Sequence, residues 1–289
     1  MSEFAVLFGF LAAAVRVATP LLFAALGEML AERAGVINLG IEGAMLAGAL
    51  AGALGASAGG PWVGLVAAMA AGLLVAAVFA LLTVGLGAHQ IITGTAMTLG
   101  AIGLTGGIYR AAYGTSGAGL SIPTFKPILL GQPAPTWLAL ALVPLLWWFL
   151  FRSRAGLALR ATGESAEQAR AAGVRVRATR AAAVIAGGAL AGLGGGSLVL
   201  AQVGTFAEKM TAGRGFIAIA IVVLGRWHPL GVLLAALLFG AATALQFLFQ
   251  AMGWNIPYQL FLALPYVLTL ILLAGAVGGV RAPAGLGRP

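Results

Sequence analysis

The sequence predicts an all-α protein, a polytopic bundle of about eight to ten transmembrane helices. Of its 289 residues, 61% are hydrophobic and only 8% are charged. A soluble domain carries about 25% charged residues, because polar side chains must cover its surface. Segments such as 63–86 and 137–151 are apolar on every face, whereas the strands of a membrane barrel alternate apolar and polar residues. Helices are therefore expected, since lipid offers no partner to an unpaired backbone group.

Nine apolar segments are candidates to cross a hydrocarbon core of about 30 Å, which takes roughly 20 helical residues. In chain order they are residues 5–27, 36–56, 62–84, 90–108, 136–151, 181–203, a short segment at 214–225, 229–250 and 258–277. Turn-forming residues separate several of them, as at Gly60-Pro61 and His228-Pro229. The first segment lacks a basic leading region and continues past Pro20, so we expect it to remain in the membrane uncleaved.

Arginine is concentrated in one loop, at residues 152–180. Seven of the 16 basic residues of the chain lie there: Arg152, Arg154, Arg160, Arg170, Arg175, Arg177 and Arg180. Short loops rich in Lys and Arg stay in the cytoplasm, so this loop is predicted to be cytoplasmic. We expect residues 1–289 to form a single transmembrane domain around it.

The orientation of the remaining loops follows from that arginine-rich loop, because successive spans cross in alternate directions. Residues 28–33, Arg226 and a short tail at 281–289 are then cytoplasmic. Residues 109–135 and 206–213 are external, and so is the N-terminus.

The residue content argues against several kinds of chemistry. The net charge of +9 would suit nucleic acid, but the basic residues border hydrophobic spans without interleaved aromatic residues. We therefore expect no nucleic-acid partner, and attraction to anionic membrane lipid instead. The chain has no Cys, no Asp and two separated His, which disfavours a metal site or a Ser-His-acid triad. Neither Lys follows a Gly, so no phosphate-binding loop is present. We expect no catalytic residue, cofactor or metal, and no enzymatic activity.

Two polar residues of the second predicted span are placed where lipid would surround them. Asn38 and Glu42 stand four positions apart, so on a helix they share one face. They could form a polar wall of a translocation pathway, or an interhelical hydrogen bond that only stabilises packing. Glycines at 35, 40 and 43 also allow an interrupted helix, as in many transporters.

The first span contains a second anomaly, Arg16. It could reach the membrane surface if the span starts late, or it could face a cavity, with Glu42 as its partner. Glu28 and Glu32 lie one turn apart beside Arg33, and this pattern is typical of a solvated helix end.

The fourth span begins with a polar stripe. His89 and Gln90 are followed by Thr93, Thr95 and Thr98, which could hydrogen-bond a hydroxylated solute. Threonines in membrane helices more often bond their own backbone or a neighbouring helix, so both interpretations stay open.

The arginine-rich loop contains an alanine-rich helical segment. The pattern predicts a short amphipathic helix that opens near Gly163 to Ser165 and ends at Gly173. Such a helix can insert into a groove of a partner and transmit motion, or it can rest on lipid.

Three motifs resemble one known family. They are GVINLGIEGAMLAG at 35–48, GLALRATGESAEQARAAGV at 156–174 and AGRGFIAIAIVVLGRWHPLG at 212–231. In this order, on a chain of this size, they are similar to the permease subunits of ABC importers for nucleosides, simple sugars and branched-chain amino acids. The segment from Ala18 to Arg33 most resembles the shorter permease of the nucleoside or simple-sugar branch.

The resemblance implies a type II importer-like fold and a set of partners: cytoplasmic ABC ATPase subunits, a second related permease and an extracytoplasmic solute-binding protein. It also implies that the ATPase is coupled through the residues of the loop motif, Arg160, Gly163, Glu164, Ala169 and Gly173. The candidate residues of the solute path are Asn38, Glu42, Arg16, His89, Gln90 and Thr93.

The function expected is thus that of a permease subunit for a nucleoside or simple sugar in the bacterial inner membrane. Two alternatives remain. One is a branched-chain amino acid permease of the same group. The other is a self-sufficient secondary transporter, in which Glu42, Arg16 and His89 relay protons or bind a coupling ion.

Overall fold

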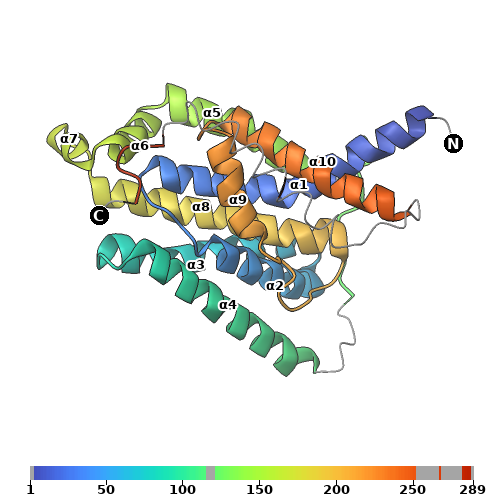
Figure 1. Cartoon of the computed structure of the whole chain (residues 1–289). Helices are drawn as coiled ribbons and strands as arrows, with labels where there is room; N and C mark the ends of the chain where they lie inside the picture. Colours follow the sequence, from blue (N-terminus) through green and yellow to red (C-terminus); the bar gives the residue numbers. More distant parts are fainter. Residues whose placement is uncertain (1–2, 115–120, 252–266, 268–281, 288–289) are drawn as a thin grey trace.

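The computed structural model describes residues 3–114, 121–251, 267 and 282–287, which form a bundle of helices (Figure 1). Seven helical segments are long and apolar enough to cross a membrane, namely Leu7–Arg33, Ile41–Gly59, Pro61–Gly85, Gln90–Tyr113, Ala134–Arg152, Val176–Val203 and Pro229–Leu248. No β-strand occurs in this part of the chain. The expected polytopic all-α fold is confirmed, and each of the first eight predicted spans overlaps a helix. The predicted span at 258–277 lies outside the described residues.

The helices follow one another closely along the chain. Their bounds are α1 (Glu3–Arg33), α2 (Ile41–Gly59), α3 (Pro61–Ala80), α4 (Gln90–Tyr113), α5 (Ala134–Arg152), α6 (Arg154–Glu164), α7 (Ala166–Ala171), α8 (Val176–Leu198), α9 (Arg214–Leu224) and α10 (Pro229–Ala251). Two helices are extended by a π-helical turn, α3 by Leu81–Gly85 and α8 by Val199–Val203.

The core of the bundle is α8, which packs against α1, α2 and α3 (Figure 1). Glycines on α8 allow these close contacts. A Cβ atom on Gly187 would overlap the backbone of Gly27 in α1, and one on Gly195 would overlap the carbonyl oxygen of Met45 in α2. Lipid tails are as apolar as leucine, so membrane helices associate through such close packing of small residues.

We expect Gly195→Ala to destabilise the bundle, because the added methyl group meets backbone atoms that have no alternative rotamer. The cost should be about 1–3 kcal/mol, the usual range for overpacking a core. Thermal unfolding of the purified variant in detergent measures it. The matched control is Gly100→Ala on α4, where nothing lies within 4 Å of the added Cβ. An equal unfolding temperature for both variants would contradict the tight α2–α8 contact.

Two segments interrupt the pattern of full-length spans. Residues 34–40 turn back between α1 and α2, and residues 204–213 lead from α8 to α9 without a helix. With 11 residues, α9 is about 16 Å long, roughly half a hydrocarbon core. It crosses in front of α8 (Figure 1), and Gly215 in its first turn is buried. The interruption expected from glycines 35, 40 and 43 corresponds to the non-helical residues 34–40, whereas Gly43 lies within α2.

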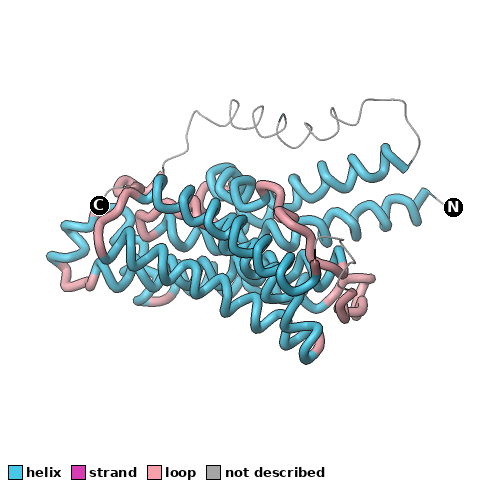
Figure 2. The backbone as a smooth tube through the Cα atoms, turned by 90° about the horizontal axis from the view of Figure 1, so that it is seen from below, coloured by secondary structure: helices cyan, strands magenta, loops and turns pink. Residues whose placement is uncertain are grey.

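The two ends of the bundle gather the loops that the charge pattern assigns to opposite sides. At one end, Arg33 Nε donates to the Trp227 carbonyl (2.8 Å), and Gly285 N donates to the Gly163 carbonyl (2.8 Å). At the other end, an Arg16 guanidinium nitrogen donates to the Gly131 carbonyl (3.0 Å). Figures 1 and 2 show the chain termini at these opposite ends. The end that carries α6 and α7 holds the arginine-rich loop, and the charge pattern predicts that this end faces the cytoplasm. We name it the cytoplasmic end, and the opposite one the external end.

Candidate functional site

Glu42 lies in the first turn of α2, and its side chain caps the N-terminus of α9. Its Oε1 accepts hydrogen bonds from Thr211 Oγ1 (2.6 Å) and Gly213 N (2.9 Å), and its Oε2 accepts one from Gly215 N (2.6 Å). The first turn of a helix has unpaired N–H groups and a partial positive charge, so a carboxylate is a favourable cap. The side chain is buried, with 5% exposed. This geometry corresponds to the packing interpretation of Glu42.

The backbones of α2 and α9 touch at this cap. A Cβ atom on Gly215 would lie 2.6 Å from the Glu42 Cα atom, so only glycine fits there. The start of α9 is therefore held to the start of α2 by direct contact as well as by the carboxylate.

Asn38 lies in the segment 34–40, which folds back against α1. Its backbone N–H donates to Glu28 Oε1 (2.9 Å), and its own Oδ1 accepts from Gly40 N (3.0 Å). These bonds satisfy backbone groups of a stretch that has no helical partners. Asn38 thus holds the turn that leads into α2, at the same level of the bundle as Glu28.

Glu28 and Glu32 are not solvated, contrary to expectation. They are 1% and 2% exposed. Asn38 covers Glu28, and the Nε1–H of Trp227 donates to Glu32 from the turn between α9 and α10. The prediction was wrong because the segment that follows α1 folds back over its last turns, and Trp227, far along the chain, packs over them as well.

Arg16 does not pair with Glu42, so the structure contradicts one of the two interpretations left open for Arg16, the cavity-facing pair. The two carboxylate oxygens of Glu42 accept from the α9 terminus, whereas Arg16 donates to the Gly131 carbonyl at the external end. The physical reason is distance along α1. Glu28, next to the α2 entrance, lies 12 residues from Arg16, or about 18 Å of helix. The half-exposed Arg16 reaches the external loop, as the surface interpretation requires.

The polar stripe of α4 divides into separate roles. Gln90 Oε1 accepts from Ile37 N (2.9 Å), and Thr98 Oγ1 donates to the Leu39 carbonyl (3.1 Å), so both brace the segment 34–40. Thr95 bonds the carbonyl of its own helix one turn earlier. His89 is exposed at the cytoplasmic end of α4, beside a hollow of about 290 Å³. Thr93 is half-buried.

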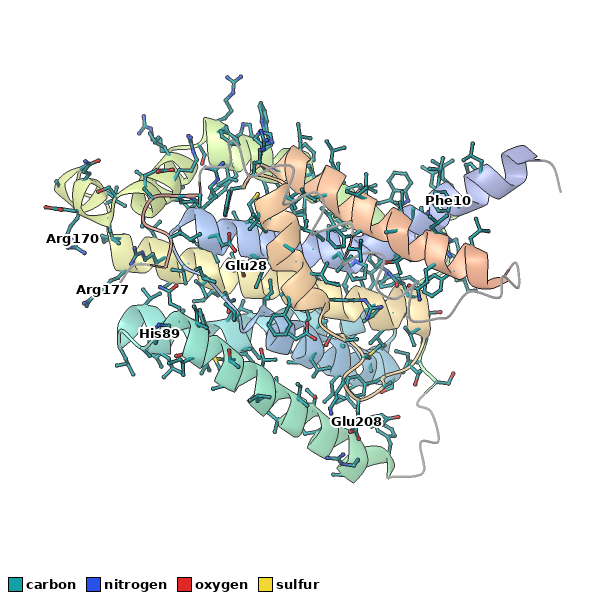
Figure 3. The ribbon with its side chains drawn as sticks, viewed as in Figure 1. Phe10, Glu28, His89, Arg170, Arg177 and Glu208 are labelled. Carbon is teal, nitrogen blue, oxygen red and sulfur yellow. The ribbon has the colours of Figure 1, made fainter. Side chains whose placement is uncertain are left out.

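The arginine-rich loop forms two helices, α6 and α7. Ser165 caps α7 by accepting from Gln168 N, and Gly173 ends the segment with a φ of +83°. The predicted short helix that opens at 163–165 and ends at Gly173 is therefore present. Figure 3 shows Arg170 and Arg177 at the tip of the cytoplasmic end, where Ala169 is buried against the bundle.

The base of this loop is joined to the membrane core at Gly163. A Cβ atom there would overlap the carbonyl oxygen of Arg33, and would lie 3.2 Å from Gly35 N. The C-terminal segment crosses the same point, since Gly285 N donates to the Gly163 carbonyl and Gly287 N to the Gly35 carbonyl. Three chain segments therefore meet at one place.

Side chains around Gly163 reinforce the junction. Glu164 Oε2 accepts from Ala284 N (3.3 Å). Arg160 Nε donates to the Leu150 carbonyl (3.0 Å), with its guanidinium 4.9 Å from the centre of the Phe151 ring. Arg160 thus links α6 to α5 through a hydrogen bond and a cation–π contact.

His228 packs against Phe151, the residue that Arg160 also contacts, and the two ring centres are 5.2 Å apart. Burial, and after it the positive charge of Arg33, lowers the pKa of His228 below its usual value. The imidazole is therefore neutral at pH 7, and its position is that of a packing group.

The sequence did not single out the partners of Glu42, which are Thr211, Gly213 and Gly215. One signal could have found them. The apolar run of α9 starts at a glycine, with no Ser, Thr, Asp or Asn to cap it, so its free N–H groups need an acceptor from elsewhere in the fold. Within the residues that the structure describes, no group of three His, Asp or Glu could hold a metal ion.

Comparison with known proteins decides the family. The family described as the branched-chain amino acid transport system / permease component matches residues 10–273. The chain belongs to this permease family. It is accordingly a multi-pass protein of the inner membrane, in agreement with its candidate spans.

Several relatives match the permease over nearly its whole length. It is 39% identical to the putative glucose ABC transporter permease protein TsgC13 of Haloferax volcanii, covering 93% of this chain and 92% of the relative. It is 36% identical to the guanosine ABC transporter permease protein NupQ of Bacillus subtilis, covering 94% and 93%. It is 34% identical to the nucleoside ABC transporter permease protein NupC of Lactococcus lactis, covering 92% and 91%. No solved structure matches the permease.

Proposed function

We propose that this permease forms half of the translocation path of an ATP-driven importer for nucleosides or simple sugars. The near full-length likeness to permeases named for glucose, guanosine and nucleosides supports this solute class over branched-chain amino acids. The partners are then a cytoplasmic ATPase, a solute-binding protein outside and a second permease. Large apolar side chains exposed on α3 and α4, such as Leu74 and Leu99, suit lipid or that second permease.

The observation that carries the coupling part of the proposal is the junction at Gly163. A push on α6 and α7 by a closing ATPase reaches Arg33 and Gly35 through direct backbone contact. Residues 34–40 continue from there to Asn38 and to Glu42, whose carboxylate holds the start of α9. An ATPase that moves the cytoplasmic loop would therefore move the two non-helical segments, residues 34–40 and 204–213, together.

The candidate path residues take different parts in this proposal. Asn38 and Glu42 position the two non-helical segments, residues 34–40 and 204–213. Arg16 lies near the external entrance, and His89, Gln90 and Thr93 lie near the cytoplasmic exit. Only weak solute contacts are needed along such a path, because tight binding would trap the solute.

The alternative of a secondary transporter has little support in this geometry. A relay between Glu42, Arg16 and His89 requires these groups to be near one another. Both carboxylate oxygens of Glu42 instead accept hydrogen bonds at the start of α9. Arg16 donates to a carbonyl at the external end, and His89 is exposed at the cytoplasmic end.

Reconstitution tests the proposed function. The permease is placed in proteoliposomes with the proposed second permease and ATPase, and the solute-binding protein is added outside. We expect uptake of a radiolabelled nucleoside or simple sugar that depends on ATP, and none of leucine. An ATPase variant that binds but does not hydrolyse ATP is the control. Gradient-driven uptake by the permease alone would contradict the proposal.

A further inference from the structure

An apolar groove opens between α8 and the helices α5 and α6 at the cytoplasmic end, with a volume of about 590 Å³. Phe149 and Leu159 form one wall. The other wall consists of Ala178, Ala182 and Ala186, which are exposed and lie on successive turns of α8. These alanines span about 12 Å along the helix, from its cytoplasmic end into the membrane. The groove therefore follows α8.

An arginine-lined hollow of about 580 Å³ continues this groove outward. Arg170, Arg175 and Arg177 line it, and all three are exposed. The two hollows share Arg175, Val174 and Ala178, so they form one composite cavity. None of the described residues that line either hollow is acidic, and Figure 3 shows Arg170 and Arg177 projecting from the same end of the bundle.

We propose that this composite cavity binds one anionic phospholipid of the cytoplasmic leaflet. The phosphate lies between Arg175 and Arg177, and an acyl chain lies along the three alanines of α8. Charge complementarity supports the headgroup position, because arginine guanidinium groups bind phosphate strongly and the cytoplasmic leaflet is rich in anionic lipid.

The size of the groove favours a lipid chain over a protein helix. A helix with its side chains is about 10 Å wide, whereas a cavity of about 590 Å³ is of the size that takes a small molecule. The polar end of the cavity lies at the cytoplasmic end of the bundle and its apolar end faces into the membrane, which is the orientation of a phospholipid in that leaflet. This inference is independent of the transported solute.

Lipid retention by the purified permease tests the proposal. The protein is equilibrated in detergent with equal amounts of phosphatidylglycerol and phosphatidylcholine, and bound lipid is counted by native mass spectrometry. We expect one phosphatidylglycerol per chain. Arg175→Gln combined with Arg177→Gln should weaken its retention about 25-fold, since each arginine near anionic lipid contributes about fivefold. Ala182→Leu should also weaken retention, because it fills the groove without changing charge.

Arg154→Gln is the matched control, since Arg154 is an exposed arginine of the same loop that lines neither hollow. It should leave retention within about twofold. Glycerol 3-phosphate, which carries the phosphate without the chains, should not displace the lipid. Equal retention of the two lipids, equal losses for Arg154→Gln and the double variant, or displacement of the lipid by the ATPase would overturn the proposal. Circular dichroism of each variant establishes that it is folded.

Discussion

Replacing Gly163 by valine is expected to lower ATP-driven uptake at least tenfold while ATP hydrolysis by the assembled transporter continues. The side chain would overlap the carbonyl oxygen of Arg33, so α6 has to move away from the end of α1. That movement separates the cytoplasmic loop from the segment 34–40. A tenfold loss of coupling corresponds to about 1.4 kcal/mol, within the usual cost of overpacking one site. Uptake and phosphate release are measured on the same proteoliposomes.

The control for Gly163 is Gly9→Val, which makes the same replacement on α1, where nothing lies within 4 Å of the added Cβ. It should keep uptake and hydrolysis near the unmodified values. Membrane insertion of both variants is checked by their yield after purification. Unchanged ATP-driven uptake in Gly163→Val would remove the junction from the coupling route.

Replacing Glu42 by alanine is expected to destabilise the permease by about 3 kcal/mol or more, because hydrogen bonds to a charged acceptor contribute about 1.5–3 kcal/mol each. Three donors at the start of α9, those of Thr211, Gly213 and Gly215, would lose their acceptor in a site without bulk water. The variant should unfold at a lower temperature and lose uptake together with stability. Thermal unfolding in detergent gives the first quantity and reconstituted uptake the second.

Glu42→Gln separates shape from charge, because glutamine keeps one acceptor oxygen in the same place. We expect an intermediate loss of stability. Glu167→Gln, on the exposed face of α7, is the matched control and should leave the unfolding temperature unchanged. If Glu42→Gln left both folding and uptake intact, the α9 cap would have no role in holding the two non-helical segments.

Much of the fold was predictable because the membrane reduces the choice of structure. A span must be helical and about 20 residues long, so apolar run length alone located the helices. Local signals also sufficed to locate α7 in the cytoplasmic loop, where Ser165 caps the start of the helix and Gly173 ends the segment, as expected. The charge pattern also grouped loops that the structure brings together, such as those of Arg33 and Trp227, while the side of the membrane that they face stays a prediction.

The roles of individual polar residues were less accessible to sequence reasoning. Glu28 and Glu32 have the pattern of a solvated helix end, because that pattern shows neither that the chain folds back at Asn38 nor that Trp227, 195 residues from Glu32, reaches them. Arg16 and Glu42 have opposite charges, but their positions along α1 and α2 separate them.

The sequence by itself determined the membrane class, the order of helices, the short helix of the arginine-rich loop and the likeness to permeases, since these depend on composition and on local patterns. Only the tertiary structure decided what Glu42 binds, where the loop joins the core at Gly163, and which cavity lies beside the arginines. The physical reason is that each of these contacts joins segments far apart in the chain. Hydrogen bonds and close backbone contacts depend on which segments the fold brings together, and a local sequence pattern does not indicate that.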